Sequence, residues 1–219
     1  MRVVKFLVSL GRGSVVTSAL LCPLLLATAR SALAEEPTDP DRAAAVWLAT
    51  TTCGTCHGPQ GNSTQPKFPR LAGQNANYLA AQLRAFRAQS RGDPDAIGYM
   101  WGMASQLDDA TVTALAAYYA SQHVETGTRD RGGAPSRGQE IYQQGIPGEG
   151  VPACSACHGP DAHGLQDFPR LAGQHAQYIL KQLASFQSNM RNVAVMHGVA
   201  QNLRTAEMQA VAEYLEPQP

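Results

Sequence analysis

Residues 53–57 read Cys-Gly-Thr-Cys-His, and residues 154–158 repeat the pattern as Cys-Ser-Ala-Cys-His. In the pattern C-x-x-C-H, two thiols one helical turn apart can form thioether bonds to the two vinyl groups of a porphyrin. The histidine that follows then lies under the iron and supplies its proximal ligand. We therefore expect two covalently attached haem c groups. The expected attachment residues are Cys53, Cys56, Cys154 and Cys157, and the expected proximal ligands are His57 and His158.

The two motifs belong to a longer internal repeat. They stand 101 positions apart, and residues 68–74 and 168–174 have the identical sequence Phe-Pro-Arg-Leu-Ala-Gly-Gln. Self-similarity of this kind indicates a tandem duplication, here of a unit of roughly 90 residues. We therefore expect two domains of the same fold.

Apolar residues recur at helical spacing in both repeats. They do so over residues 79–86 and 179–186, and again over residues 112–119 and 208–215. No stretch alternates between apolar and polar residues as a half-buried strand does. The pattern predicts an all-α fold. Helix starts are expected at Asp39-Pro40, and at Ser136, where Ser-x-x-Gln resembles a capping box.

The first 34 residues resemble a secretory leader. A basic start is followed by a mostly apolar stretch over residues 15–29, and Ala32-Leu33-Ala34 offers the small residues of a cleavage site. We expect cleavage after Ala34 and export to the periplasm, although Arg30 lies close to the cut and retention as an anchor stays open. Four of the 17 basic residues lie in this leader, so the mature chain has a formal charge of −4. This balance argues against a nucleic-acid partner, which requires a basic surface.

The expected organisation has four parts. Residues 1–34 form the signal peptide, residues 35–124 the first domain, residues 125–135 a linker, and residues 136–219 the second domain. A domain of this size has little apolar core of its own, and a buried haem would supply the missing apolar bulk. We expect the haem-free protein to fold poorly.

Each iron needs a sixth ligand if it is to be closed to substrates. Candidates are Met100 and Met103 in the first repeat, and Met190, Met196 and His197 in the second. The repeat register at this point is 96 residues, which matches Met100 to Met196 and leaves Met103 and Met190 without methionine counterparts. We assign Met100 and Met196, with His197 as the rival. Methionine in a helical protein is otherwise most often a core-filling residue.

The shared Phe-Pro-Arg stretch suggests supporting roles. The carbonyl of Pro69 or Pro169 can accept the free N–H of the proximal imidazole and so fix its tautomer; an ordinary turn is the alternative. Arg70 and Arg170 follow directly and can pair with haem propionates, or simply be solvated.

Other interpretations of the cysteine motifs explain less. Four thiolates can hold zinc, and a C-x-x-C pair can form a redox disulfide. Neither accounts for the histidine after each pair or for the repeated methionine downstream. The remaining histidines, His123, His163 and His175, are expected at the surface.

Taken together, the motifs resemble the dihaem cytochrome c4 family. The resemblance rests on C-x-x-C-H-G, on the Phe-Pro-Arg-Leu-Ala-Gly-Gln stretch, on a Tyr-x-x-x-Gln-Leu helix and on the aligned methionines, and it covers nearly the whole mature chain. It implies two class I cytochrome c domains, each wrapped round one covalently bound haem. It also implies histidine–methionine ligation of both irons, which carries over to His57 with Met100 and His158 with Met196.

The resemblance further implies a periplasmic carrier of single electrons that is not itself an enzyme. Its partners would be a quinol-oxidising complex and a terminal oxidase of the cbb3 type, with membrane contact only through those partners. An alternative is the electron-accepting subunit of a dehydrogenase, such as flavocytochrome c sulfide dehydrogenase. A dihaem peroxidase is a further alternative, but it needs an open iron, and the aligned methionines argue against one.

Overall fold

The computed structural model describes residues 40–125 and 136–219. The expected signal peptide, Asp39 and residues 126–135 of the expected linker lie outside the described residues. Within the described part the fold is helical, as expected, and its only strand-like pairing is an isolated bridge between Ile146 and Val151. No helix in that part combines the length and apolarity that a bilayer span requires.

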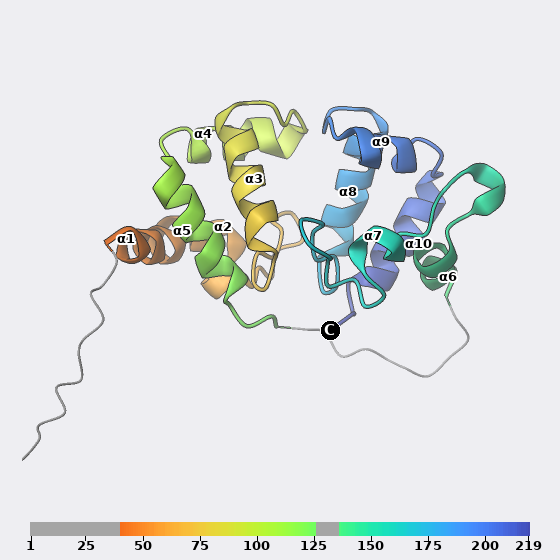
Figure 1. Cartoon of the computed structure of the whole chain (residues 1–219), viewed down its shortest axis with the longest axis horizontal. Coiled ribbons are helices and arrows are strands. Elements are labelled where there is room, and N and C mark those ends of the chain that lie inside the picture. The colour runs from red at the N-terminus through yellow and green to blue at the C-terminus, as the bar shows by residue number, and fades with distance from the viewer. Residues whose placement is uncertain (1–39, 126–135) are drawn as a thin grey trace, which may run out of the picture. The chain divides into compact units, whose positions relative to one another are not determined.

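In each repeat the α-helices follow one another in the same order, whereas the short π-helical and 3-10 turns between them differ (Figure 1). The first repeat contains α1 (Pro40–Leu48), the π-helical turn η1 (Ala49–Cys53), α2 (Gly54–His57), the 3-10 turn η2 (Pro59–Gly61), α3 (Ala76–Arg87), the π-helical turn η3 (Ala96–Met100), α4 (Trp101–Ala104) and α5 (Asp109–Ala120). The second contains α6 (Arg137–Gln144), the 3-10 turn η4 (Pro147–Glu149), α7 (Ser155–His158), α8 (Ala176–Gln187), α9 (Ala194–Ala200) and α10 (Thr205–Leu215).

Side-chain caps begin several of these helices. Asn75 accepts a hydrogen bond from the backbone N–H of Tyr78 at the start of α3, and Asp108 caps α5 in the same way. Ser136 accepts from the N–H of Gln139, which is one of the two bonds of the expected capping box. Such caps satisfy N–H groups that the first helical turn leaves without partners.

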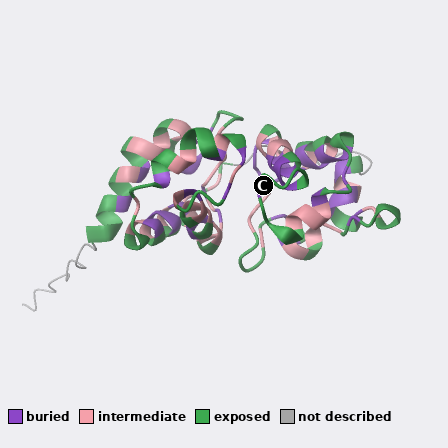
Figure 2. Cartoon of the chain, turned by 90° about the horizontal axis from the view of Figure 1, so that it is seen from above, coloured by how far each residue is buried: buried purple, intermediate pink, exposed green. Residues whose placement is uncertain are grey.

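The same packing pattern forms both cores. Helix α5 packs against α1 and α3, and α10 packs against α6 and α8. Their contact faces carry the apolar positions found in the sequence, including the buried Val112 and Leu115 of α5 and Val211 and Leu215 of α10. Figure 2 shows buried and exposed residues alternating along these helices, as expected for amphipathic helices round a core.

Polar side chains from the two repeats meet in a buried cluster. Arg91 donates to Gln82 Oε1 and to Gln182 Oε1, both at 2.8 Å. Arg191 donates to the same two oxygens, at 2.9 Å for Gln82 and 2.8 Å for Gln182. Each glutamine oxygen therefore accepts from both guanidinium groups. We call these four residues, together with Asp93, the arginine cluster.

Asp93 is the carboxylate of the arginine cluster. Its Oδ2 accepts from Arg91 Nε at 2.7 Å, and the two side chains are 2% and 7% exposed. Desolvation by burial would raise the pKa of Asp93, but the neighbouring Arg91 and further hydrogen bonds outweigh it and lower that pKa. The second repeat has Val193 two residues after Arg191, where the first has Asp93 two residues after Arg91. One carboxylate therefore serves two buried arginines.

We expect Asp93→Asn to destabilise the protein strongly, by about 3–5 kcal/mol, because it leaves buried cations without a counter-charge. Denaturant unfolding at pH 7 measures the loss. Because the pKa of Asp93 is lowered, its contribution is fully present above the ordinary aspartate pKa of about 3.9. This contribution to stability is lost as the pH falls below about 3.9 and through the lower pKa that Asp93 has in the folded protein.

Asp109→Asn is the matched control, because Asp109 pairs with Arg84 and Arg87 but is 70% exposed. Ion pairs in solvent contribute little. Equal losses for the two variants would contradict the role assigned to Asp93.

Candidate haem-binding sites

The cysteines of each motif lie on a short helical segment. Cys53 ends η1 and Cys56 lies in α2, one turn further on; Cys154 precedes α7, which contains Cys157. All four are partly exposed, and none forms a disulfide in the structure. Burial raises the pKa of the Cys53 thiol, and raises that of Cys154 to about 11. The Cys53 and Cys154 thiols are therefore protonated at neutral pH, and each lies one helical turn before the second cysteine of its motif.

The histidine of the first motif is buried and oriented by one hydrogen bond. His57 Nδ1 lies 2.8 Å from the carbonyl oxygen of Pro69. Burial lowers the pKa of His57, and the bond to Pro69 opposes that effect only in part. The ring is therefore neutral, and because a carbonyl only accepts, the proton must be on Nδ1. Nε2 keeps its lone pair, which an iron ligand needs.

The second motif repeats this geometry. His158 Nδ1 lies 2.9 Å from the carbonyl oxygen of Pro169, and burial lowers the pKa of His158 as well. The sequence predicted both proline contacts, and the structure contains both. The phenylalanine before each proline packs edge-on against the imidazole, at 6.2 Å for Phe68 and 6.1 Å for Phe168 between ring centroids. This aromatic support was not inferred from the sequence, although the identical stretch was the available signal.

A glycine follows each histidine in a conformation that few other residues adopt. Gly58 has φ +75° and ψ 168°, and Gly159 has φ +81° and ψ 159°. A Cβ on Gly58 would lie 2.4 Å from the backbone oxygen of Asn62, whereas one on Gly159 would first meet Leu165, at 3.4 Å. The chain therefore turns sharply after each histidine, and more tightly in the first repeat.

The candidate distal residues lie in three different environments. Met100 is partly buried against the cluster of Phe86, Ala96 and Ala104, and Met196 is partly buried against the second core. Met103 and Met190, by contrast, are 50% and 49% exposed. The structure thus separates the pair matched by the repeat, which is partly buried, from the two unmatched methionines, which are exposed.

His197, the rival to Met196, lies in α9. Its Nδ1 is 2.9 Å from the carbonyl oxygen of Phe186, to which it can donate. This bond holds the ring against the end of α8.

The two arginines of the shared stretch differ. Arg70 donates from Nε to Ser63 O at 3.1 Å and from Nη1 to Gly173 O at 2.6 Å, so part of its guanidinium is engaged by protein. Arg170 Nε is buried and has no hydrogen-bond partner among the described residues. Desolvation lowers the pKa of Arg170. An unpartnered buried donor at this place suits an anionic group such as a propionate.

His175 does not lie at the surface, and that expectation is wrong. It is 3% exposed, and its Nε2 lies 2.9 Å from the carbonyl oxygen of Ser63 in the other repeat. Its counterpart Asn75 caps a helix with its side chain, whereas His175 makes no cap and reaches across to the first repeat. His123 and His163 are exposed, as expected.

The described residues fit a covalently bound haem better than the alternatives. Each site presents two thiols on one helical turn and a neutral, oriented imidazole with a free Nε2, and the second also has an unpartnered guanidinium nitrogen. Within residues 40–125 and 136–219, no three His, Cys, Asp or Glu side chains converge as a zinc site requires. The Cys and His of each motif would hold the haem, and Arg170 would face a propionate.

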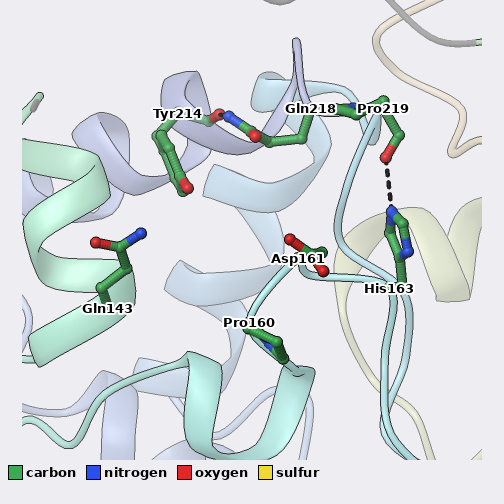
Figure 3. A pocket seen from close by; sticks show the side chains of 7 residues that line it. All are labelled: Gln143, Pro160, Asp161, His163, Tyr214, Gln218 and Pro219. Atoms are coloured by element: carbon green, nitrogen blue, oxygen red, sulfur yellow. Dashed lines mark hydrogen bonds between the residues drawn. The ribbon is translucent and has the colours of Figure 1, made fainter. Parts of the chain in front are cut away.

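A small cavity of about 230 Å³ lies near the second motif but contains none of its cysteines or its histidine. Figure 3 shows its polar lining, in which His163 Nε2 lies 2.8 Å from the carbonyl oxygen of Pro219. The lining residues are Gln143, Pro160, Asp161, His163, Tyr214, Gln218 and Pro219. We assign no ligand to it.

Known proteins show the same organisation. The cytochrome c family model matches residues 41–122 and 135–218. A cytochrome c-552 of Acidithiobacillus ferridurans is 40% identical over 202 residues, covering 91% of this chain and 86% of the relative. A thiosulfate dehydrogenase electron acceptor of Thiomonas intermedia is 38% identical over 188 residues, covering 81% and 85%. A solved cytochrome c4 structure from Acidithiobacillus ferrooxidans matches with a TM-score of 0.70 at 41% identity, covering 75% of this chain and 97% of that chain.

Two helical repeats, each with its own haem-attachment motif, define a dihaem c-type cytochrome with two covalently bound haem c groups. The chain belongs to the cytochrome c family and, within it, to the dihaem cytochrome c4 family. It is an electron-transfer protein.

We expect Gly58→Ala to destabilise the protein more than Gly159→Ala does. Both variants place a side chain in a backbone region that is essentially restricted to glycine, at a cost of about 1–3 kcal/mol. Gly58→Ala adds a clash with a backbone oxygen, which cannot move aside as the Leu165 side chain can. Denaturant unfolding of the haem-loaded variants measures both losses.

Gly148→Ala serves as the control, because a Cβ there meets nothing within 4 Å. If Gly58→Ala and Gly159→Ala cost the same, the tighter turn in the first repeat has no energetic consequence.

Proposed function

We propose that this protein is a periplasmic carrier that accepts and donates single electrons through two closed irons, ligated by His57 with Met100 and by His158 with Met196. It would receive electrons from a quinol-oxidising complex and pass them toward a terminal oxidase of the cbb3 type. Bound haem supplies an iron that gains and loses one electron. The leader-like residues 1–34 support the periplasmic location.

The observation that supports closed irons most strongly is the equivalence of the two repeats. Both proximal imidazoles are neutral, buried and held by a proline carbonyl, at 2.8 and 2.9 Å. Two methionines in the same repeat register, Met100 and Met196, are partly buried. A thioether opposite an imidazole raises the reduction potential and blocks the access that a catalytic iron needs.

The protein contributes orientation and exclusion of water rather than bond-making chemistry. The Nδ1–H···O bonds hold each imidazole plane, so that Nε2 does not reorient when the charge at the iron changes. Because both imidazoles are buried, little water next to them has to reorganise when the charge at the iron changes. Both effects favour electron exchange without a chemical step.

The ligand assignment is tested by replacing Met100, Met196 and His197 one at a time with alanine. We expect Met100→Ala and Met196→Ala each to remove one haem's share of the weak far-red sulfur-to-iron absorption of the ferric protein and to lower that haem's potential. His197→Ala should leave this band unchanged. A band that survives in Met196→Ala but disappears in His197→Ala would overturn the assignment in the second repeat.

A second candidate function is that of electron acceptor for a dehydrogenase. It is favoured by the 38% identical relative named as a thiosulfate dehydrogenase electron acceptor. As an electron acceptor the protein would use the same pair of closed irons as the proposed carrier. The two functions differ only in the partner.

Stopped-flow spectroscopy of the mature protein separates the two candidate functions. We expect membranes containing a cbb3-type oxidase to reoxidise the ferrous protein in air, and boiled membranes not to do so. Reduction of the ferric protein by a periplasmic extract only when thiosulfate is added, with no reoxidation by the membranes, would instead assign the dehydrogenase role.

A further inference from the structure

One peptide group links the proximal histidine of the first repeat to a side chain of the second. The carbonyl of the Pro69–Arg70 peptide accepts from His57 Nδ1 at 2.8 Å. The N–H of the same peptide, on Arg70, donates to Gln174 Oε1 at 2.9 Å. Gln174 is the last residue of the second Phe-Pro-Arg-Leu-Ala-Gly-Gln stretch.

The reverse link is also present. The Pro169–Arg170 peptide accepts from His158 Nδ1 at 2.9 Å, and its N–H donates to Gln74 Oε1 at 2.7 Å. The connection is therefore crossed: the glutamine of each repeat contacts the peptide that holds the histidine of the other.

The glutamine amides are held in one orientation. Gln174 Nε2 donates to Arg70 O, and Gln74 Nε2 donates to Arg170 O, both at 2.9 Å. Exchanging oxygen and nitrogen would bring donor against donor and acceptor against acceptor, so the amides cannot be reversed. Gln74 is 6% exposed and Gln174 is 7% exposed, so bulk water does not compete for these bonds.

Hydrogen bonds at the two ends of one peptide strengthen each other. An acceptor on the N–H increases the negative partial charge on the carbonyl oxygen, which then accepts more strongly. A stronger acceptor at Nδ1–H makes the imidazole more basic at Nε2. A more basic ligand stabilises ferric over ferrous iron and lowers the reduction potential.

We propose that Gln174 and Gln74 are positioning residues that tune the reduction potential across the repeat boundary, Gln174 acting on the haem of His57 and Gln74 on the haem of His158. This inference rests on the proposed proximal ligation by those histidines. Because each tuning bond crosses between the repeats, a change at the interface that displaces Gln174 or Gln74 would alter the electronic properties of the iron on the other side. Gln174 and Gln74 would thus couple the interface to electron transfer.

The test compares Gln174→Leu and Gln74→Leu with the unmodified haem-loaded protein. Haem methyl resonances followed by NMR through a redox titration give the potential of each haem separately. We expect Gln174→Leu to raise the potential of the His57 haem more than that of the His158 haem, and Gln74→Leu to do the reverse. In the ferrous protein, the Nδ1–H resonance of the affected histidine should move upfield as its hydrogen bond weakens.

Two further variants separate tuning from loosening of the interface. Asn77→Ala removes another bond between the repeats, from Asn77 Nδ2 to Asp167 Oδ1 at 2.8 Å, without touching either peptide; it should leave both potentials unchanged. Gln174→Glu keeps an oxygen for the Arg70 N–H, and in its protonated form it can also donate to Arg70 O, so it should not raise the potential of the His57 haem.

Equal shifts of both haems in Gln174→Leu, or a rise in Gln174→Glu as well, would overturn the tuning role. Failure of the proposed ligation would look different. In that case the unmodified ferrous protein would lack the ring-current-shifted signals of a ligating histidine, whatever the glutamine variants do.

Discussion

The hydrogen bond from each proximal imidazole to a proline carbonyl is the constraint on which the sites depend. It sets the protonated nitrogen of His57 and His158, and so leaves Nε2 available to iron. The cysteine helix, the tight glycine turn after the histidine and the edge-packed phenylalanine all place that ring against that carbonyl. Because only 12 residues separate His57 from Pro69 and 11 separate His158 from Pro169, each repeat can form its site locally.

Buried polar side chains form an important part of the contact between the repeats. The arginine cluster places two guanidinium groups and one carboxylate out of water, and the two crossed glutamines satisfy backbone groups that would otherwise be buried without partners. Replacing a buried ionic group as a whole with apolar residues costs little, but removing one partner is costly, so each group demands a specific partner. We infer that they define how the repeats meet. Of these groups, Gln74 and Gln174 carry the proposed coupling between interface and iron.

Much of this protein could be predicted from sequence because its informative contacts are short-range. Helical periodicity identified the corresponding helices of the two repeats. The spacing from His57 to Pro69 suggested the imidazole contact. Contacts between the repeats were not predictable in this way. The sequence predicts His175 at the surface because its counterpart is Asn75, but the folded chain buries it between Ser63 of the first repeat and Glu216 of its own. Asp93 pairs with the nearby Arg91, but its second cationic neighbour, Arg191, comes from the other repeat.

The sequence by itself determined that two haems are attached, at which cysteines, and on what kind of helical scaffold, because C-x-x-C-H chemistry and helical periodicity are local properties of the chain. The internal repeat also paired Met100 with Met196 by register alone. Only the tertiary structure decided which peptide each of Gln74 and Gln174 contacts. Those contacts join residues about a hundred positions apart, and no local pattern encodes the meeting of two surfaces that form only after each repeat has folded.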